Sequence, residues 1–372
     1  MQRRVMIIDF MHLAYKYAYG GARQLTATLK INGVPTIVDT TLPAYIIKGI
    51  DRWSHGGFYP TVVCFDGAGC SKHRKAYFNS FAEQDAEVSG YKGTREIQDS
   101  RFYEGINLTM NYLLKGGVCC LKADGYEADD LIKAAVDKAK ETYGKDMPID
   151  IVTGDADLVP LVDEQVSVFL QSRKMTWAVD KDCEKLHYMQ ITPDNYQEYM
   201  EGLTAFKNLS VPYNTVLLAK CLRGDKSDNV KGYPKFTPTK YNNLITQLEQ
   251  DGYNLGELCR YGNPIGTICY RDTQIPIPED KLDEVPRDNK MIIYSEPREC
   301  SELCNVLSDY LDSDIVDHVR RVYNGINLNC AFTGLPEGMN RRPAVIKADI
   351  KGYLQAELQR CLSELQIKLK IV

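Results

Sequence analysis

The hydrophobic positions of this chain fall into short runs that alternate with longer amphipathic segments. Three runs, at residues 5–8, 61–65 and 149–154, are mostly apolar and rich in β-branched residues. Short runs closed by Gly or Asp are typical of strands buried on both faces. Residues 128–142 carry apolar side chains at helical spacing and stop at Gly144, which predicts a helix. This alternation predicts an α/β fold, with a mostly parallel central sheet flanked by helices.

An aspartate stands at the end of each of these strands: Asp9, Asp66 and Asp155. A single aspartate after a strand is commonly a helix cap, but capping does not require three such positions. Ligands of parallel sheets bind outside the carboxyl ends of the strands, so these side chains are expected to lie together. Asp157 follows Asp155 at i+2 and would point to the same side in extended backbone.

Two further segments supply acidic residues. The helix predicted at residue 128 opens with Glu127, Asp129 and Asp130, and Asp225 and Asp228 form another pair. A helix macrodipole explains one or two acids at a helix start, but three carboxylates this close repel unless a cation separates them. Nine oxygen-rich side chains favour Mg²⁺ or Mn²⁺ over zinc. Two such ions about 4 Å apart can activate water and stabilise the leaving oxygen of a phosphodiester.

Charge and composition narrow the class of protein. The 372 residues suggest two to three domains. No apolar run is long enough to span a membrane, and the first apolar run is too short for a signal peptide. The 12 cysteines are scattered, which favours a reduced, cytoplasmic setting. The net charge is −5, but nine of the 50 acids belong to one cluster. The rest of the chain is slightly basic, so a polyanionic partner is not excluded.

A basic segment rich in aromatic residues, at residues 71–103, joins two of the predicted core elements. Composition alone favours a solvated basic face over a helical excursion that binds a ligand.

The motifs taken together resemble the flap endonuclease family of 5′ nucleases, in the style of tailed-phage 5′–3′ exonucleases and the 5′-nuclease domain of bacterial DNA polymerase I. Five motifs follow the family's order within residues 1–250: MIIDF, CFDG, GYEADDLI, TGDADLVPLV and LRGDKSDNV. The resemblance implies a PIN-like catalytic domain at 1–215, with a helical arch at about 71–103. It also implies a helix–hairpin–helix-type DNA-binding region at 216–250, before a C-terminal extension of unknown role at 251–372.

The resemblance also implies roles for individual residues. A first Mg²⁺ would lie among Asp66, Glu127, Asp129 and Asp130, with Asp9 bonding through water. A second Mg²⁺ would lie among Asp155, Asp157, Asp225 and Asp228, and Mn²⁺ is expected to substitute for either ion. In the arch motif, Lys92 and Arg95 would steady the scissile phosphate and Tyr91 would stack on a nucleobase. This implication replaces the solvated-face interpretation of the basic segment. For His12, Lys16 and Arg173, DNA contacts and ordinary surface or core roles both stay open.

Residues 229–238 depart from the family's glycine-rich turn. Gly232 matches the first glycine, whereas Lys235 and Thr237 stand where two more are expected. Glycine allows close backbone approach and positive φ, so the departure argues against a monovalent cation bound in this turn. Lys231, Lys235 and Lys240 could instead pair with DNA phosphates.

The region after residue 250 contains many prolines, and only residues 301–310 and 344–369 are predicted to be helical there. Cys259, Cys269, Cys300 and Cys304 could form a zinc site, but their loose spacing favours ordinary buried thiols.

The function implied is a Mg²⁺-dependent, structure-specific 5′ nuclease, with both 5′–3′ exonuclease and flap endonuclease activity, in DNA replication and repair. Its expected partners are DNA with 5′ flaps, nicks or RNA primers, and replication proteins such as a single-strand-binding protein. A monomer without membrane association is expected. The alternatives are an RNA-processing ribonuclease on a related acidic scaffold and a non-catalytic DNA-junction binder. The arch motif and residues 224–229 argue against the ribonuclease, and the nine acids argue against the binder.

Overall fold

The structure is a computed structural model. It describes residues 3–19, 26–31, 34–39, 41–79, 100–115, 118–122, 125–171, 188–202, 206, 208–212, 215–226, 228–259, 268–270, 273–275, 293–294, 301–326 and 331–332.

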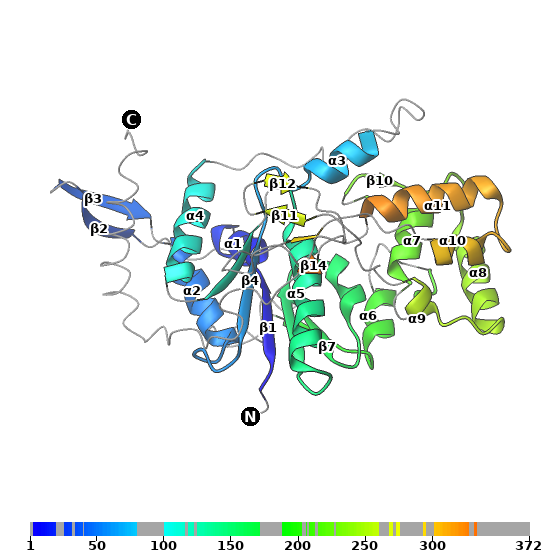
Figure 1. The fold of residues 1–372 in the computed structure, drawn as a ribbon, viewed down its shortest axis with the longest axis horizontal. Coiled ribbons are helices and arrows are strands. Elements are labelled where there is room, and N and C mark those ends of the chain that lie inside the picture. Colours follow the sequence, from blue (N-terminus) through cyan, green and yellow to red (C-terminus); the bar gives the residue numbers. More distant parts are fainter. Residues whose placement is uncertain are drawn as a thin grey trace.

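A six-stranded sheet, in the order β5-β4-β1-β6-β7-β8, forms the centre of the molecule (Figure 1). Its strands are β1 (Val5–Asp9), β4 (Thr61–Phe65), β5 (Cys119–Lys122), β6 (Ile149–Thr153), β7 (Val166–Gln171) and β8 (Tyr188–Ile191). Every neighbouring pair is parallel except β7 and β8. The prediction of a mostly parallel sheet is therefore confirmed, and the three predicted strands β1, β4 and β6 are neighbours.

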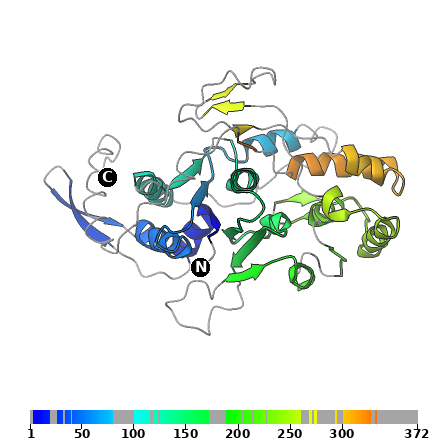
Figure 2. The same cartoon turned by 60° about the horizontal axis from the view of Figure 1, so that its bottom comes forward.

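The sheet is covered on both faces. Val5 and Ile7 of β1 belong to a core with helix α5 (Ala128–Tyr143) on one face. Met6 and Ile8 belong to a second core on the other face. That core includes side chains of α1 (Phe10–Tyr19), α2 (Thr41–Trp53) and α4 (Ser100–Lys115) (Figure 2). Each fully buried aliphatic side chain contributes about 1.5–3 kcal/mol, so continuous apolar runs are required where a strand has no solvent face.

A group of helices lies beside the sheet (Figure 1). It comprises α6 (Tyr196–Gly202), α7 (Val216–Arg223), α8 (Pro238–Gln250), α9 (Leu255–Leu258), α10 (Ser301–Leu307) and α11 (Ser313–Ile326). Strands β9 (Gly224–Asp225) and β10 (Val230–Lys231) form a hairpin between α7 and α8. Side chains of α10 and α11 share one hydrophobic core with α7 and α8.

The sequence prediction missed helix α11 altogether. Its buried face, Ile315, Val316, Val319, Val322 and Tyr323, does follow helical spacing. The helix predicted at residues 344–369 lies outside the described residues.

The remaining elements are peripheral or short. They are α3 (Lys72–Asn79), the hairpin β2 (Thr26–Ile31) and β3 (Val34–Asp39), and a small sheet of β11 (Ile268–Tyr270), β12 (Thr273–Ile275), β13 (Ile293–Tyr294) and β14 (Ala331–Phe332). No helix in the described part of the chain is long and apolar enough to cross a membrane.

Candidate metal centre and nucleic-acid interface

The parallel strands deliver acidic residues to one edge of the sheet. Asp9 ends β1, and in the register Asp9 lies opposite Cys64 while Ile8 lies opposite Val152. Asp66 and Asp155 follow β4 and β6 and therefore emerge at the same edge. Asp9 is buried, and its Oδ2 accepts a 2.8 Å hydrogen bond from the Thr153 hydroxyl. Burial, with a smaller contribution from the charge of Asp66, raises the pKa of Asp9 to about 6.

Asp155 and Asp157 are held together by a short helical turn. Asp155 caps the 3₁₀ helix η1 (Ala156–Leu161), and its Oδ1 accepts the backbone N–H of Asp157 at 2.9 Å. Burial, followed by the neighbouring charge of Asp157, raises the pKa of Asp155 to about 7. Two carboxyl groups with raised pKa values at one sheet edge make a site that favours a cation.

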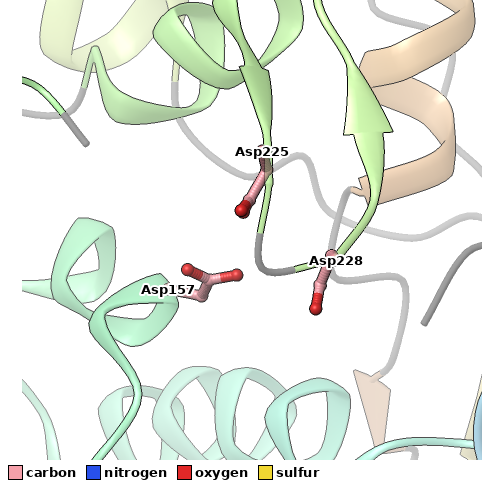
Figure 3. Close-up of side chains that lie close together, drawn as sticks. All are labelled: Asp157, Asp225 and Asp228. Carbon is pink, nitrogen blue, oxygen red and sulfur yellow. The ribbon is translucent and has the colours of Figure 1, made fainter. Parts of the chain in front are cut away.

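Asp157, Asp225 and Asp228 converge from three segments. Asp157 lies in η1, Asp225 in β9 and Asp228 in the turn before β10, and their side chains face a common space (Figure 3). One carboxylate oxygen of each lies within 4.8 Å of the others. An all-oxygen set of carboxylates fits a hard divalent cation, so these three side chains can hold one.

A buried lysine from α7 neutralises part of this trio. Lys220 Nζ donates to Asp225 Oδ2 at 2.6 Å and forms an ion pair with Asp157. Lys220 is only 8% exposed, so its ammonium group is largely shielded from solvent. The sequence prediction did not identify Lys220. A lysine within an otherwise apolar helix, five residues before Asp225, could have indicated a buried partner of the acids.

A second buried cation engages the other acidic segment. Arg74 of α3 donates to Glu127 Oε2 at 2.9 Å. It also donates to both carboxylate oxygens of Asp130, at 2.8 and 2.6 Å. Asp130 Oδ2 accepts the backbone N–H of Glu127 at 3.2 Å, which closes a capping box at the start of α5. Arg74 belongs to the basic segment of the sequence, but its role at the acids was not predicted.

The other two acids of the predicted first ion lie beside this capping box. Asp66 Oδ1 accepts the backbone N–H of Ala128 at 2.8 Å, and Asp129 is half-buried in the first turn of α5. The structure therefore brings the predicted acids to one region, in which Glu127 and Asp130 bind an internal arginine.

The side chain of His12, in α1, packs closely against Gly154, which follows β6. A Cβ there would lie 2.3 Å from His12 Nδ1. His12 Nε2 lies 2.8 Å from the Tyr188 hydroxyl, which Lys16 Nζ also contacts at 3.3 Å. Burial lowers the pKa of His12 to about 3, so its imidazole is neutral and joins α1 to β8.

The predicted DNA-binding turn has a defined backbone. A Cβ on Gly232 would lie 2.2 Å from the carbonyl carbon of Arg223, so packing alone requires glycine there. Lys235 has φ of 60°, the left-handed region that glycine adopts readily. Thr237 instead caps α8 by accepting the backbone N–H of Lys240 at 3.3 Å. Lys231, Lys235 and Lys240 are all exposed.

Some predicted residues fall outside the described part of the chain: Tyr91, Lys92, Arg95, Arg173, Cys300 and the side chain of Cys269. Cys259 and Cys304 are buried free thiols. Within the described ranges, the aspartate trio is the only group of three or more His, Cys, Asp or Glu side chains placed to hold a metal ion. The zinc hypothesis therefore gains no support from these residues.

The geometry can be compared with known proteins. The family model described as "5′-3′ exonuclease, N-terminal resolvase-like domain" matches residues 4–188. The 5′-3′ exonuclease of Mycoplasma pneumoniae is 30% identical over 248 residues, which cover 66% of this chain and 72% of that protein. The thermostable DNA polymerase I of Thermus filiformis is 27% identical over 62% of this chain, but the match spans only 22% of the polymerase.

Solved structures show a more distant likeness. The T5 D15 protein co-crystallized with metal ions is 14% identical, with a TM-score of 0.49 over 96% of this chain and 99% of that chain. The sequence match to the Mycoplasma pneumoniae protein covers most of that protein's length, and the family model spans the strands that carry Asp9, Asp66 and Asp155. The chain belongs to the 5′-3′ exonuclease family.

Proposed function

We propose that this chain is a Mg²⁺-dependent, structure-specific 5′ nuclease that hydrolyses phosphodiesters of RNA primers or 5′ flaps, as both 5′–3′ exonuclease and flap endonuclease. The observation that carries the proposal is the convergence of Asp157, Asp225 and Asp228 beside Asp9 and Asp155. Family membership supports a nuclease role for that site. Substrate, partners and working cation are part of the proposal.

The acidic residues would form two groups, one for each cation. Asp157, Asp225 and Asp228 would hold one Mg²⁺ together with Asp155, and Asp66, Asp129 and Asp9 would hold a second, with Glu127 and Asp130 beside it. When bound, such ions supply an activated water and stabilisation of the leaving oxygen. Lys220 and Arg74 offset part of the repulsion between the carboxylates before a cation binds.

Positive charge outside the cluster would bind the substrate. Lys231, Lys235 and Lys240 are exposed around the turn and would contact duplex phosphates. Lys92 and Arg95 would steady the scissile phosphate, and Tyr91 would stack on a base.

The test uses end-labelled 5′-flap, nicked and single-stranded DNA, matched RNA-primed duplexes, and single-stranded RNA. Each is incubated with the protein in Mg²⁺, Mn²⁺ or EDTA, and the products are mapped. The proposal predicts divalent-dependent release of 5′ fragments from flaps or primers. Cleavage of single-stranded RNA alone would indicate the ribonuclease instead. Junction binding without cleavage in either cation would indicate a non-catalytic binder.

A further inference from the structure

Helix α3 supplies a buried arginine that binds two acids of the cluster. Its Arg74 is 8% exposed and binds Glu127 and both oxygens of Asp130, as described above. A bidentate guanidinium–carboxylate pair fixes orientation as well as charge. The positions of Glu127 and Asp130 therefore depend on where α3 lies.

The position of α3 in turn depends on helix α11. Phe78 lies one helical turn after Arg74, on the same side of α3, and is 5% exposed. Its ring packs directly on Gly325, near the end of α11, where an added Cβ would lie 2.3 Å from Phe78 Cζ. Figure 2 shows α3 against this end of α11. Only glycine lets the ring approach the helix backbone this closely.

The rest of α11 is attached to the opposite side of the site. A ring nitrogen of His318 lies 3.0 Å from the backbone oxygen of Cys221 in α7. The Tyr233 hydroxyl, from the turn after β10, donates to Asp314. Helix α7 also carries Lys220, so α11 joins the elements that supply both buried cations.

We infer that α11 is a positioning element of the acidic cluster, and that Gly325 and Phe78 act through Arg74 to set Glu127 and Asp130. The inference rests on the proposed function and assigns a role to part of the region after residue 250. Gly325 and Phe78 are positioning residues, because neither contacts an acid of the cluster in the interactions described.

The decisive variant is Gly325→Ala. Alanine favours a helix interior over glycine, so a loss cannot come from helix propensity and must come from displacement of Phe78. Single-turnover flap cleavage is expected to fall about 10- to 100-fold, the scale for a small misplacement remote from the reacting atoms. Withdrawal of Arg74 leaves more uncompensated negative charge, so Mn²⁺ binding measured by calorimetry without DNA should tighten about 3- to 10-fold. A variant that only damages the fold would lower both the cleavage rate and the affinity for Mn²⁺.

Double variants show whether the effect runs through the named residues. Gly325→Ala should cost little further rate in a Phe78→Ala or an Arg74→Gln background, since the contact is already gone. Asp317→Ala, on the exposed side of the same helix, is the control and should match the wild type. Thermal unfolding of every variant verifies that it is folded.

Unchanged rate and Mn²⁺ affinity in Gly325→Ala would overturn the inference while leaving the proposed function intact. Equal losses of rate in the wild-type and Phe78→Ala backgrounds would also overturn it. If the wild type cleaves nothing but Gly325→Ala still tightens Mn²⁺ binding, the proposed function fails and the positioning role stands.

Discussion

Burial disfavours the ionised form of the carboxyl groups of Asp9 and Asp155. Their pKa values rise from the ordinary 3.8 to about 6 and about 7. An acid whose pKa is higher in the folded than in the unfolded state binds more protons when folded, so the free energy of unfolding falls as pH rises between those values. The penalty is complete above pH 7, where a bound divalent cation would offset it.

Asp155→Asn should stabilise the cation-free protein in a pH-dependent way. The amide removes a buried charge, so the free energy of unfolding should increase by about 0.5–3 kcal/mol at pH 8 and by much less near pH 4.5. Chemical denaturation in EDTA at both pH values measures this. The same substitution should abolish most Mg²⁺-dependent cleavage while DNA binding persists. A gain in stability that is equal at both pH values would contradict the assigned pKa shift.

Lys235 combines a charge with a strained backbone, and two substitutions separate them. Both Lys235→Ala and Lys235→Gly remove a phosphate contact, so the slope of log K against log salt for duplex DNA in Ca²⁺ should become shallower by about 0.9. Only glycine adopts the observed φ of 60° without penalty, so the glycine variant should be about 0.5–1 kcal/mol more stable than the alanine variant. An unchanged slope in both would place duplex binding elsewhere.

At the scale of elements, helix α7 supplies an internal counter-ion to the aspartate trio. Lys220→Met keeps the volume but removes the charge that lies between Asp157 and Asp225. We expect a loss of about 1–3 kcal/mol in EDTA. The deficit should shrink in saturating Mn²⁺, because a divalent cation replaces the missing charge and binds only the folded state. Thermal unfolding in both buffers measures the two deficits, and equal deficits would show that Lys220 merely packs.

The elements that could be predicted are those whose burial in the fold follows directly from the hydrophobic pattern of their own residues. Strands β1, β4 and β6 are buried on both faces, so their apolar runs identify them, and α5 has caps at both ends. Helix α11 also carries apolar residues at helical spacing, so its existence could have been predicted, but its packing against α7 and α3 could not. Its partners are about a hundred or more residues away in the chain, and pairing over such distances cannot be deduced from one sequence.

In the candidate site, too, local sequence features could be predicted and contacts between distant segments could not. Most of the nine acids stand out in sequence because they follow a strand or open a helix, and Asp225 and Asp228 stand out as a closely spaced pair. The basic residues that pair with these acids could not be identified from the sequence. Arg74 lies 53 and 56 residues from Glu127 and Asp130, and nothing in the sequence distinguishes it from the other basic residues. The positive φ of Lys235 was likewise hidden, since the sequence shows only a lysine where glycine is expected.

Across the whole molecule, we propose that the sheet edge, η1 and the β9–β10 hairpin form one site for divalent cations. Cation binding should therefore stabilise the entire fold. Adding Mn²⁺ at 100 times its Kd should raise the free energy of unfolding by about 2.7 kcal/mol. Asp225→Asn should remove most of this gain, whereas Glu141→Gln, on the exposed surface of α5, should retain it. A gain retained by both variants would move the cation site away from the trio.

We propose that Asp157, Asp225 and Asp228 form a catalytic cation site in a 5′ nuclease. The most direct test is single-turnover cleavage of an end-labelled 5′-flap substrate in saturating Mg²⁺ by the wild type, Glu141→Gln and the double variant Asp157→Asn, Asp225→Asn. We expect equal cleavage by the first two and a rate at least about 10³-fold lower for the double variant, matching several kcal/mol of lost transition-state stabilisation. Flap binding in Ca²⁺ should be retained by all three. Near-wild-type cleavage by the folded double variant would contradict the account.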